Sequence, residues 1–225
     1  MKRKFKKSKS FSIKPESKIL IMGSSGELKK RKLGKIIDTY DIVCRINGNG
    51  NHEILNNKNK DIIGTKKDIW FCLEPTGLRR NNPSLINKFN LVFVNNKKIY
   101  EDSKRRYKNL RLFPLDLTPH IKNTLFNFNG CSLKYEPTSG LKTIFYFINH
   151  FHPDPLEKGC MGTIYNNIHL YGFDGFQSGH WYGNKFIKNQ DESDANGVKG
   201  LGRHHLTKEF EYIKYLDKNN FLKII

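Results

Sequence analysis

The 225-residue sequence has few cysteines, no long apolar run and few acidic residues. Its four cysteines form no C-x-x-C pair and have no histidine at zinc-ligand spacing, which argues against a structural zinc site and against a disulfide framework. No stretch approaches the roughly 18–20 apolar residues of a membrane span. The N-terminus, MKRKFKKSKSFS, lacks the apolar core of a signal peptide. The sequence therefore predicts a soluble, cytoplasmic protein in a reducing compartment.

Acidic residues are outnumbered: 40 Lys and Arg stand against 21 Asp and Glu, a formal charge of +19. Such a surplus attracts polyanions in general, whether nucleic acid, acidic membrane faces or anionic small substrates. Apart from residues 2–9, the basic residues are spread along the whole chain. No RNP-type string or heptad basic region accompanies them, so charge alone does not indicate nucleic-acid binding.

Two common nucleotide-binding signatures are also missing. There is no GxGxxG and no P-loop, which disfavours dinucleotide binding and a P-loop ATPase. No D-x-D follows an apolar strand, and Asp191, Glu192 and Asp194 lie in a polar loop instead. The sequence therefore predicts neither a divalent metal site nor any cofactor.

What the sequence does contain is an alternation of short apolar runs and helical patterns, which is typical of α/β proteins. Ser24 and Glu27 form a capping-box pattern that predicts the start of a helix. We expect one Rossmann-like domain over 17–225, with a mostly parallel sheet and helices on both faces, after a flexible basic leader at 1–16. Strands are predicted at 18–22, 42–46, 68–73, 91–94, 168–173 and in the apolar end FLKII, and further helices at 137–151 and about 206–218.

The first small-residue turn, Gly23-Ser24-Ser25-Gly26, leads from a strand into a helix. Small residues let a ligand approach the backbone, and the N–H groups of a helix start favour phosphate. Asn47 ends the next strand, at the sheet edge where open α/β sheets bind ligands. An ordinary strand-to-helix turn would have the same local sequence, so the turn alone leaves both interpretations open.

A second turn, Thr138-Ser139-Gly140 after a proline, has the same character. Its hydroxyls and amides suit a carboxylate or phosphate, although Thr138 or Ser139 could equally be a plain helix N-cap. Gly172 lies near the end of the strand predicted at 168–173, and a long loop follows from Asp174 to Arg203. Loops of that length are commonly functional lids or disordered segments.

Of the eight histidines, His180 and the His204–His205 pair stand out because they lie in or at the end of this long loop. His204 precedes Glu209 by five positions, at the opening of the last helix. Taken alone, Glu209 would be a carboxylate in the first turn of a helix, where the helix dipole stabilises its negative charge. His204 would be an ordinary loop residue. The His204–Glu209 spacing indicates a function only when it is considered together with the order of the other motifs.

In that order, the motifs resemble those of the sialyltransferases of glycosyltransferase family 29. They resemble the large, small, third and very small sialylmotifs over about 18–225. The matching segments are GSSGEL at 23–28, LGKIID at 33–38, DIVCRIN at 41–47, GTK at 64–66, PTSG at 137–140, LYGF at 170–173, HWY at 180–182 and HHLTKE at 204–209.

The resemblance implies the glycosyltransferase A-type fold variant of that family. It also implies transfer of sialic acid from a CMP-linked donor to a glycan hydroxyl, without metal and with inversion. His204 would be the general base, His180 would donate to the departing phosphate, and Glu209 would hold or polarise the site. The residues that would contact the donor are Gly23, Ser24, Ser25, Asn47, Thr138, Ser139, Gly140, Gly172 and Tyr182.

The departures from the family pattern also carry information. Ile19 and Tyr165 stand where animal members have a disulfide-forming cysteine pair, and Gly183 stands where the third motif often has an acid. Another CMP-linked 2-keto sugar acid such as Kdo is an alternative donor. A non-catalytic CMP-sugar binder and a basic nucleic-acid binder are the alternatives from other classes. The acceptor, the linkage and the oligomeric state cannot be read from these residues.

Overall fold

The computed structural model describes residues 11–47, 59–73, 78, 86–114, 116–151, 167–175 and 204–225. The strands are β1 (Ile19–Met22), β2 (Ile42–Ile46), β3 (Ile69–Cys72), β4 (Leu91–Val94), β5 (Leu110–Leu112), β6 (Ile168–Tyr171) and β7 (Lys223–Ile224). The helices are the 3-10 helix η1 (Gly26–Lys30) and the α-helices α1 (Gly34–Ile37), α2 (Lys60–Ile63), α5 (Lys97–Ser103), α6 (Leu117–Asn129), α7 (Ser139–Phe151) and α9 (Leu206–Lys218).

The seven strands form one sheet in the order β5-β4-β3-β2-β1-β6-β7, and every pairing in it is parallel. The central strands are buried along their whole length, because helices cover both faces; their sequences are therefore continuous apolar runs such as ILIM. The predicted α/β domain is confirmed, and the sheet is wholly parallel where the sequence predicted mostly parallel.

The strand order reverses at β1. From β1 the chain steps outward through β2, β3, β4 and β5, and it then returns to place β6 on the other side of β1. Open α/β sheets bind ligands outside the carboxyl ends of the strands at such a reversal. Gly23 follows β1 and Gly172 follows β6, so the topology points to the surroundings of these two turns.

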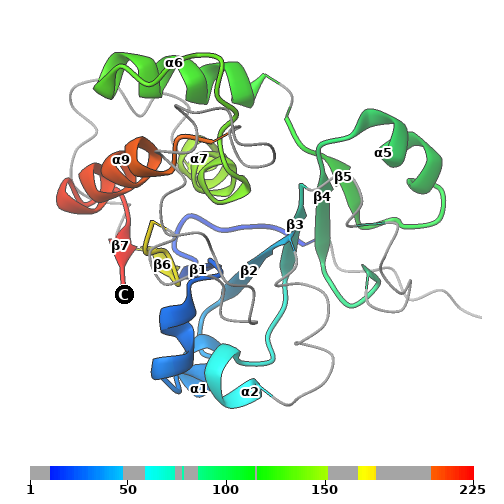
Figure 1. Cartoon of the computed structure of the whole chain (residues 1–225). Coiled ribbons are helices and arrows are strands. Elements are labelled where there is room, and N and C mark those ends of the chain that lie inside the picture. The colour runs from blue at the N-terminus through cyan, green and yellow to red at the C-terminus, as the bar shows by residue number, and fades with distance from the viewer. Residues whose placement is uncertain are drawn as a thin grey trace, which may run out of the picture.

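Two layers of helices enclose the sheet (Figure 1). Helices α6, α7 and α9 cover one face, where Ile21 and Leu170 from the strands pack with Leu141, Ile144 and Ile213. Helices α1 and α2 lie on the other face, over a second cluster formed by residues such as Leu20, Met22, Leu28 and Ile37. A third cluster fills the β4–β5 end around Trp70 and Phe89, whose rings stack with centroids 5.6 Å apart.

Two features of the local structure differ from the sequence-based picture. The N-cap of η1 is Ser25, whose Oγ accepts a hydrogen bond from the Glu27 N–H at 3.1 Å, so the capping-box assignment to Ser24 was wrong. The physical reason is that the chain turns into a short 3-10 helix one residue later than the S-x-x-E pattern implies. In addition, no element was predicted between 97 and 129, where the structure has α5, β5 and α6.

The N-terminal region and the buried Arg45 both make contacts that hold chain segments against the core. Phe11 and Ile13, from the segment assigned to the leader, pack against the larger core cluster, while residues 1–10 lie outside the described part of the chain. The Arg45 guanidinium is buried and donates hydrogen bonds to the carbonyl oxygens of Ile63 and Lys66, which holds the segment after α2 against the sheet. Within the described ranges, no helix has the length and apolar character needed to cross a membrane.

Candidate active site

The turns after β1 and β6 meet where the strand order reverses. The Gly23 N–H donates to the Tyr171 carbonyl oxygen at 2.8 Å, and the Ser25 N–H donates to the Gly172 carbonyl oxygen at 3.0 Å. These bonds continue the β1–β6 pairing beyond the strands themselves. The predicted first turn and the predicted Gly172 turn are therefore neighbours in space.

The glycines of this region let the backbone and one aromatic ring come close together. A Cβ at Gly23 would lie 2.2 Å from the Gly172 carbonyl oxygen and 2.9 Å from Phe173 Cδ2. A Cβ at Gly140 would lie 2.9 Å from Phe173 Cε1, on the opposite edge of the same ring. Gly172 itself has φ +79°. Close packing around Phe173 thus explains Gly23 and Gly140, whereas a Cβ at Gly172 would meet Leu28 Cδ2 at 2.8 Å. Phe173 is the last residue of the LYGF segment, but the sequence analysis assigned it no role in the site.

Asn47 joins the first and second motif segments. Its side-chain N–H donates to Ser139 Oγ at 2.9 Å, and its side-chain oxygen accepts the Leu73 N–H at 3.0 Å. Its backbone oxygen accepts the Trp70 indole N–H at 2.9 Å, and its φ of +44° turns the chain sharply out of β2. Asparagine tolerates that left-handed conformation better than most residues. The ends of β2 and β3 and the start of α7 are thus tied together at one point.

Thr138 is both the N-cap of α7 and the partner of Glu209. Its Oγ1 accepts the Leu141 N–H at 3.2 Å, as an N-cap does, and its own N–H and hydroxyl donate to the two Glu209 oxygens at 2.9 and 2.6 Å. Glu209 is 4% exposed. Desolvation raises the pKa of this carboxyl to about 7, even though the bonds from Thr138 and the charge of Lys142 favour the ionised form.

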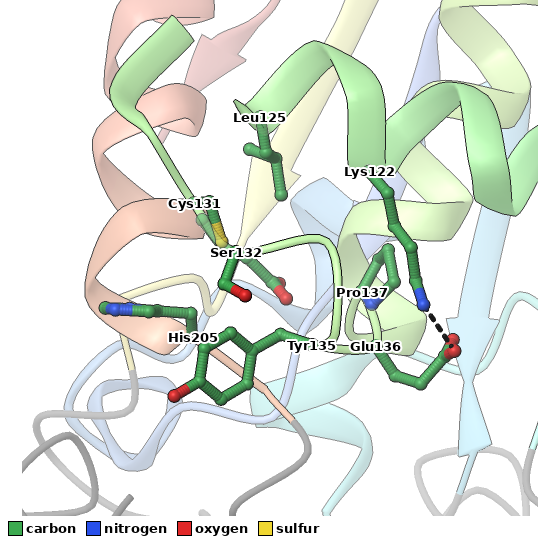
Figure 2. Close-up of a pocket in the computed structure, with 9 residues that line it drawn as sticks. Lys122, Leu125, Cys131, Ser132, Tyr135, Glu136, Pro137 and His205 are labelled. Carbon is green, nitrogen blue, oxygen red and sulfur yellow. Dashed lines mark hydrogen bonds and ion pairs between the residues drawn. The ribbon is translucent and has the colours of Figure 1, made fainter. Parts of the chain in front are cut away.

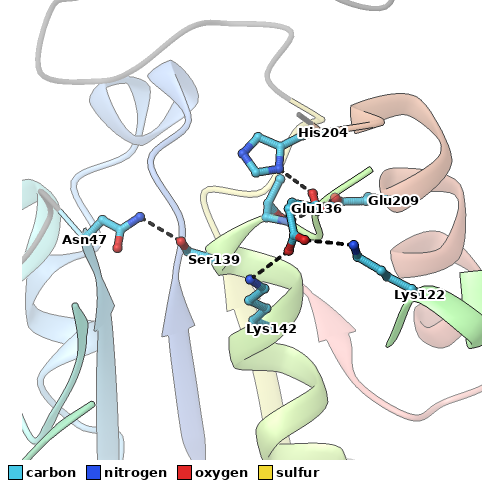
Figure 3. Close-up of polar contacts among 8 residues, drawn as sticks. Asn47, Lys122, Glu136, Ser139, Lys142, His204 and Glu209 are labelled. Atoms are coloured by element: carbon cyan, nitrogen blue, oxygen red, sulfur yellow. Dashed lines mark hydrogen bonds and ion pairs between the residues drawn. The ribbon is translucent and has the colours of Figure 1, made fainter. Parts of the chain in front are cut away.

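His204 lies against the segment that leads into α7 (Figure 3). Its Nδ1 is 2.5 Å from the Glu136 carbonyl oxygen. A carbonyl oxygen can only accept, so Nδ1 carries the hydrogen, and in the neutral ring the basic lone pair belongs to Nε2. That tautomer is the one a general base needs if Nε2 faces the reacting hydroxyl.

The Glu136 carboxylate is held by two lysines from different helices. It lies 2.8 Å from the Lys122 Nζ of α6 and 3.5 Å from the Lys142 Nζ of α7 (Figure 3). Desolvation would raise the pKa of Glu136, but the bonds and charges of the two lysines outweigh it, and the pKa is lowered. Neither Glu136 nor the lysines belong to a motif, and only their spatial position relative to His204 reveals them.

A small pocket lies beside this network (Figure 2). It lies between the end of α6, the connection to α7 and the start of α9. The lining includes Cys131, Ser132, Tyr135 and His205, with the Tyr135 and His205 rings edge to face at 5.3 Å. The buried His205 Nδ1 has no hydrogen-bond partner among the described residues, in contrast to His204 Nδ1. The two adjacent histidines thus differ sharply in their surroundings.

Three predicted site positions need separate mention. His180 and Tyr182 lie outside the described residues. Ser24 follows Gly23 in the turn after β1. Within the described part of the chain, no group of three or more His, Cys, Asp or Glu side chains is arranged to hold a metal ion.

No protein-family model matches the sequence, and no curated protein matches it. Solved structures do match. A mammalian sialyltransferase in complex with Gal-beta-1-3GalNAc-ortho-nitrophenol superposes with a TM-score of 0.54, at 16% identity, over 92% of this chain and 68% of that one. The sialyltransferase CstII from Campylobacter jejuni, in complex with the substrate analogue CMP-3FNeuAc, gives a TM-score of 0.51 at 17% identity, over 92% of this chain and 80% of that one.

This chain has the sialyltransferase fold. The expected fold variant is thereby confirmed, and at 16–17% identity the likeness concerns the fold. On this sialyltransferase fold, the structure brings together the described parts of the first, second and last motifs. Asn47 contacts Ser139, and Thr138 contacts Glu209. His204 contacts Glu136, the residue before the PTSG segment.

Proposed function

We propose that this protein is a glycosyltransferase that moves sialic acid, or a related 2-keto sugar acid such as Kdo, from its CMP-linked form to a glycan hydroxyl. The observation that carries the proposal is that separate motifs meet around one helix start. Asn47 bonds to the first residue of α7, Glu209 bonds to its N-cap, and His204 bonds just ahead of it. The shared fold with solved sialyltransferases supports the same proposal.

The reaction would be a single displacement at the anomeric carbon. The acceptor oxygen forms a bond to that carbon while the bond from the carbon to the CMP phosphate oxygen breaks, which inverts the configuration. The acceptor proton passes to His204 Nε2, the nitrogen that holds the lone pair while Nδ1 donates to Glu136. A base of this kind contributes about 10²–10⁴-fold to the rate.

The departing CMP carries the charge released in the step, and we propose that His180 donates to its phosphate. In this proposal Gly23, Ser24 and Ser25 approach the CMP portion through their backbone, and Gly140 and Gly172 lie at the adjoining turns. Thr138, Ser139 and Tyr182 would contribute further donor contacts.

Asn47 would contribute both to the shape of the site and to donor binding. Its side-chain N–H and oxygen each make one bond within the protein, and an amide group can make more. It would therefore fix the shape of the site and also contact the donor. No metal is required in this scheme, because His180 would supply the charge stabilisation that a metal provides in other enzymes.

Calorimetric titration with CMP, UDP and GDP, each with and without EDTA, tests the donor class. We expect CMP to bind in preference to the other two nucleotides, with an affinity that EDTA does not change. Equal binding of all three nucleotides, or loss of CMP binding in EDTA, would contradict the proposal.

Transfer itself is tested with CMP-sialic acid and CMP-Kdo against a panel of glycan acceptors, with release of CMP as the readout. Acceptor-dependent CMP release supports the transferase. Tight CMP-sugar binding without release across the whole panel would instead identify a non-catalytic CMP-sugar binder. Salt-sensitive binding of RNA or DNA, together with indifference to CMP, would identify a nucleic-acid binder.

A further inference from the structure

We propose that Glu136 is a positioning residue for His204: its carboxylate, ion-paired to Lys122 and Lys142, fixes the backbone whose carbonyl oxygen sets the His204 tautomer. This inference rests on the proposed function only for its kinetic consequence. The tautomer itself is a property of the resting protein.

The connection between α6 and α7 is the element that carries the Glu136 carbonyl. The Glu136 side chain is 46% exposed and belongs to neither helix, so a backbone bond to His204 here needs an anchor. The anchor comes from both flanking helices at once, from the Lys122 Nζ at 2.8 Å and the Lys142 Nζ at 3.5 Å. The two lysine side chains are only 21% and 12% exposed, so their charges face the carboxylate more than the solvent.

The segment on the other side of the bond is anchored as well. Glu209 bonds to Thr138, and the Asn129 side-chain N–H donates to the Lys208 carbonyl oxygen at 3.0 Å. The Lys208 Nζ in turn donates to the Asn129 carbonyl oxygen. The first turn of α9 is thus held to both ends of the α6–α7 connection. Near the α7 end of this connection, the Glu136 carboxylate meets Lys122 and Lys142 (Figure 3).

The chemical consequence concerns which imidazole nitrogen is basic. While the Glu136 carbonyl stays in place, Nδ1–H is the favoured donor and Nε2 holds the lone pair. If the carbonyl moves away, that bond weakens and the other tautomer gains population. The fraction of protein with a competent base then falls, while the turns that would bind the donor are unchanged.

The test is long-range ¹H–¹⁵N NMR of the histidine side chains in the full chain at a pH where the rings are neutral. The His204 signal is assigned by its loss in His204→Ala. We expect the Nδ1–H tautomer in the wild type, and in Glu136→Gln a measurable shift of the His204 signals toward the Nε2–H form. Glu136→Asp, which keeps the charge, should restore part of the wild-type signal, and Lys122→Met should shift it as Glu136→Gln does.

Glu101→Gln is the matched control, because it removes an ion pair with Lys104 on the exposed surface of α5. It should leave the His204 signals unchanged. If the His204 signals in both Glu136→Gln and Lys122→Met match those of the wild type, the positioning role is wrong. Because Glu136 is nearly half exposed, the Gln variant should remain folded, and circular dichroism and thermal melting verify this.

The kinetic readout separates this inference from the proposed function. If the wild type transfers sugar, Glu136→Gln should lower kcat by about 10- to 100-fold, with an unchanged KM for the donor. A tautomer shift in a protein without transferase activity would uphold the positioning role and reject the function. Transferase activity in the wild type with no tautomer shift in the Glu136 and Lys122 variants would support the function and reject the positioning role.

Discussion

The Glu209 carboxylate receives two hydrogen bonds from one residue, Thr138, through its backbone N–H at 2.9 Å and its hydroxyl at 2.6 Å. Since Thr138 also caps α7 through the Leu141 N–H, a buried carboxyl from α9 completes the start of another helix. The α7 N-terminus favours the negative charge, and burial disfavours it. The balance of these effects gives the carboxyl a pKa of about 7.

The raised pKa makes stability depend on pH in a defined direction. The native carboxyl binds its proton up to about pH 7, and the unfolded carboxyl only up to its ordinary 4.5. Between these values the native state holds more protons, so stability falls as pH rises. We expect the free energy of unfolding of the wild type, relative to Glu209→Gln, to fall by on the order of 3 kcal/mol across this window.

Urea denaturation of both proteins from pH 4.5 to 8 measures this difference. Glu211→Gln on the same helix is the control, because Glu211 is exposed and its removal should leave the pH slope of the wild type intact. A difference between wild type and Glu209→Gln that stays constant with pH would contradict the burial effect.

Asn47 should be far more important for stability than another asparagine with a similar backbone. Asn47→Ala loses the bonds to Ser139 and Leu73 and strains a φ of +44°, so we expect a loss of about 2–3 kcal/mol in unfolding free energy. Asn220 has φ +60° in an exposed position, and Asn220→Ala should lose about 1 kcal/mol through strain alone. Equal losses in the two variants would mean that the Asn47 side-chain bonds contribute nothing.

Gly23 should tolerate no side chain. A methyl group there would meet the Gly172 carbonyl oxygen at 2.2 Å, and backbone atoms cannot move aside as a side chain can. We expect Gly23→Ala to lose at least about 3 kcal/mol in a thermal or urea melt. Gly130→Ala is the comparison, since φ is +68° but no atom lies within 4 Å of the new Cβ, and about 1 kcal/mol of strain is expected. A greater loss at Gly130 would show that the crowding at Gly23 relaxes easily.

The adjacent histidines give the clearest activity test. His204→Ala should reduce transfer by at least about two orders of magnitude while CMP affinity stays the same, because the base acts on the acceptor hydroxyl. His205 faces the small pocket, and its Nδ1 has no partner among the described residues, so His205→Ala should transfer at close to the wild-type rate. Near-normal transfer by His204→Ala rejects the general-base role.

The sequence predicted the central sheet well because its strands are buried on both faces. Runs such as ILIM and IWFC have no polar interruption, and a short apolar run bounded by polar turns is typical of a buried strand. The last helix was predicted at about 206–218, and these are the bounds of α9 in the structure. In contrast, β5 has only three residues and an exposed Arg111 in its middle, so it gives almost no sequence signal.

The candidate site was predictable only in part, for a geometrical reason. Asn47, Thr138, Ser139, His204 and Glu209 belong to motifs, and the structure does bring them to the start of α7. Their mutual bonds could not be read from the chain, because they join segments that are far apart in sequence. Glu136, which belongs to no motif, acts through its backbone oxygen, an atom that every residue has.

The position of β6 next to β1 affects how the molecule can be built during synthesis. Strands β1 to β5 emerge from the ribosome in order, but the place beside β1 stays vacant until Ile168–Tyr171 has been translated. Helix α9, with His204 just before it, comes still later. Non-local parallel pairings of this kind form slowly. The nascent chain therefore holds an incomplete sheet with an open edge, and the candidate base reaches its partner only after β6 has been translated.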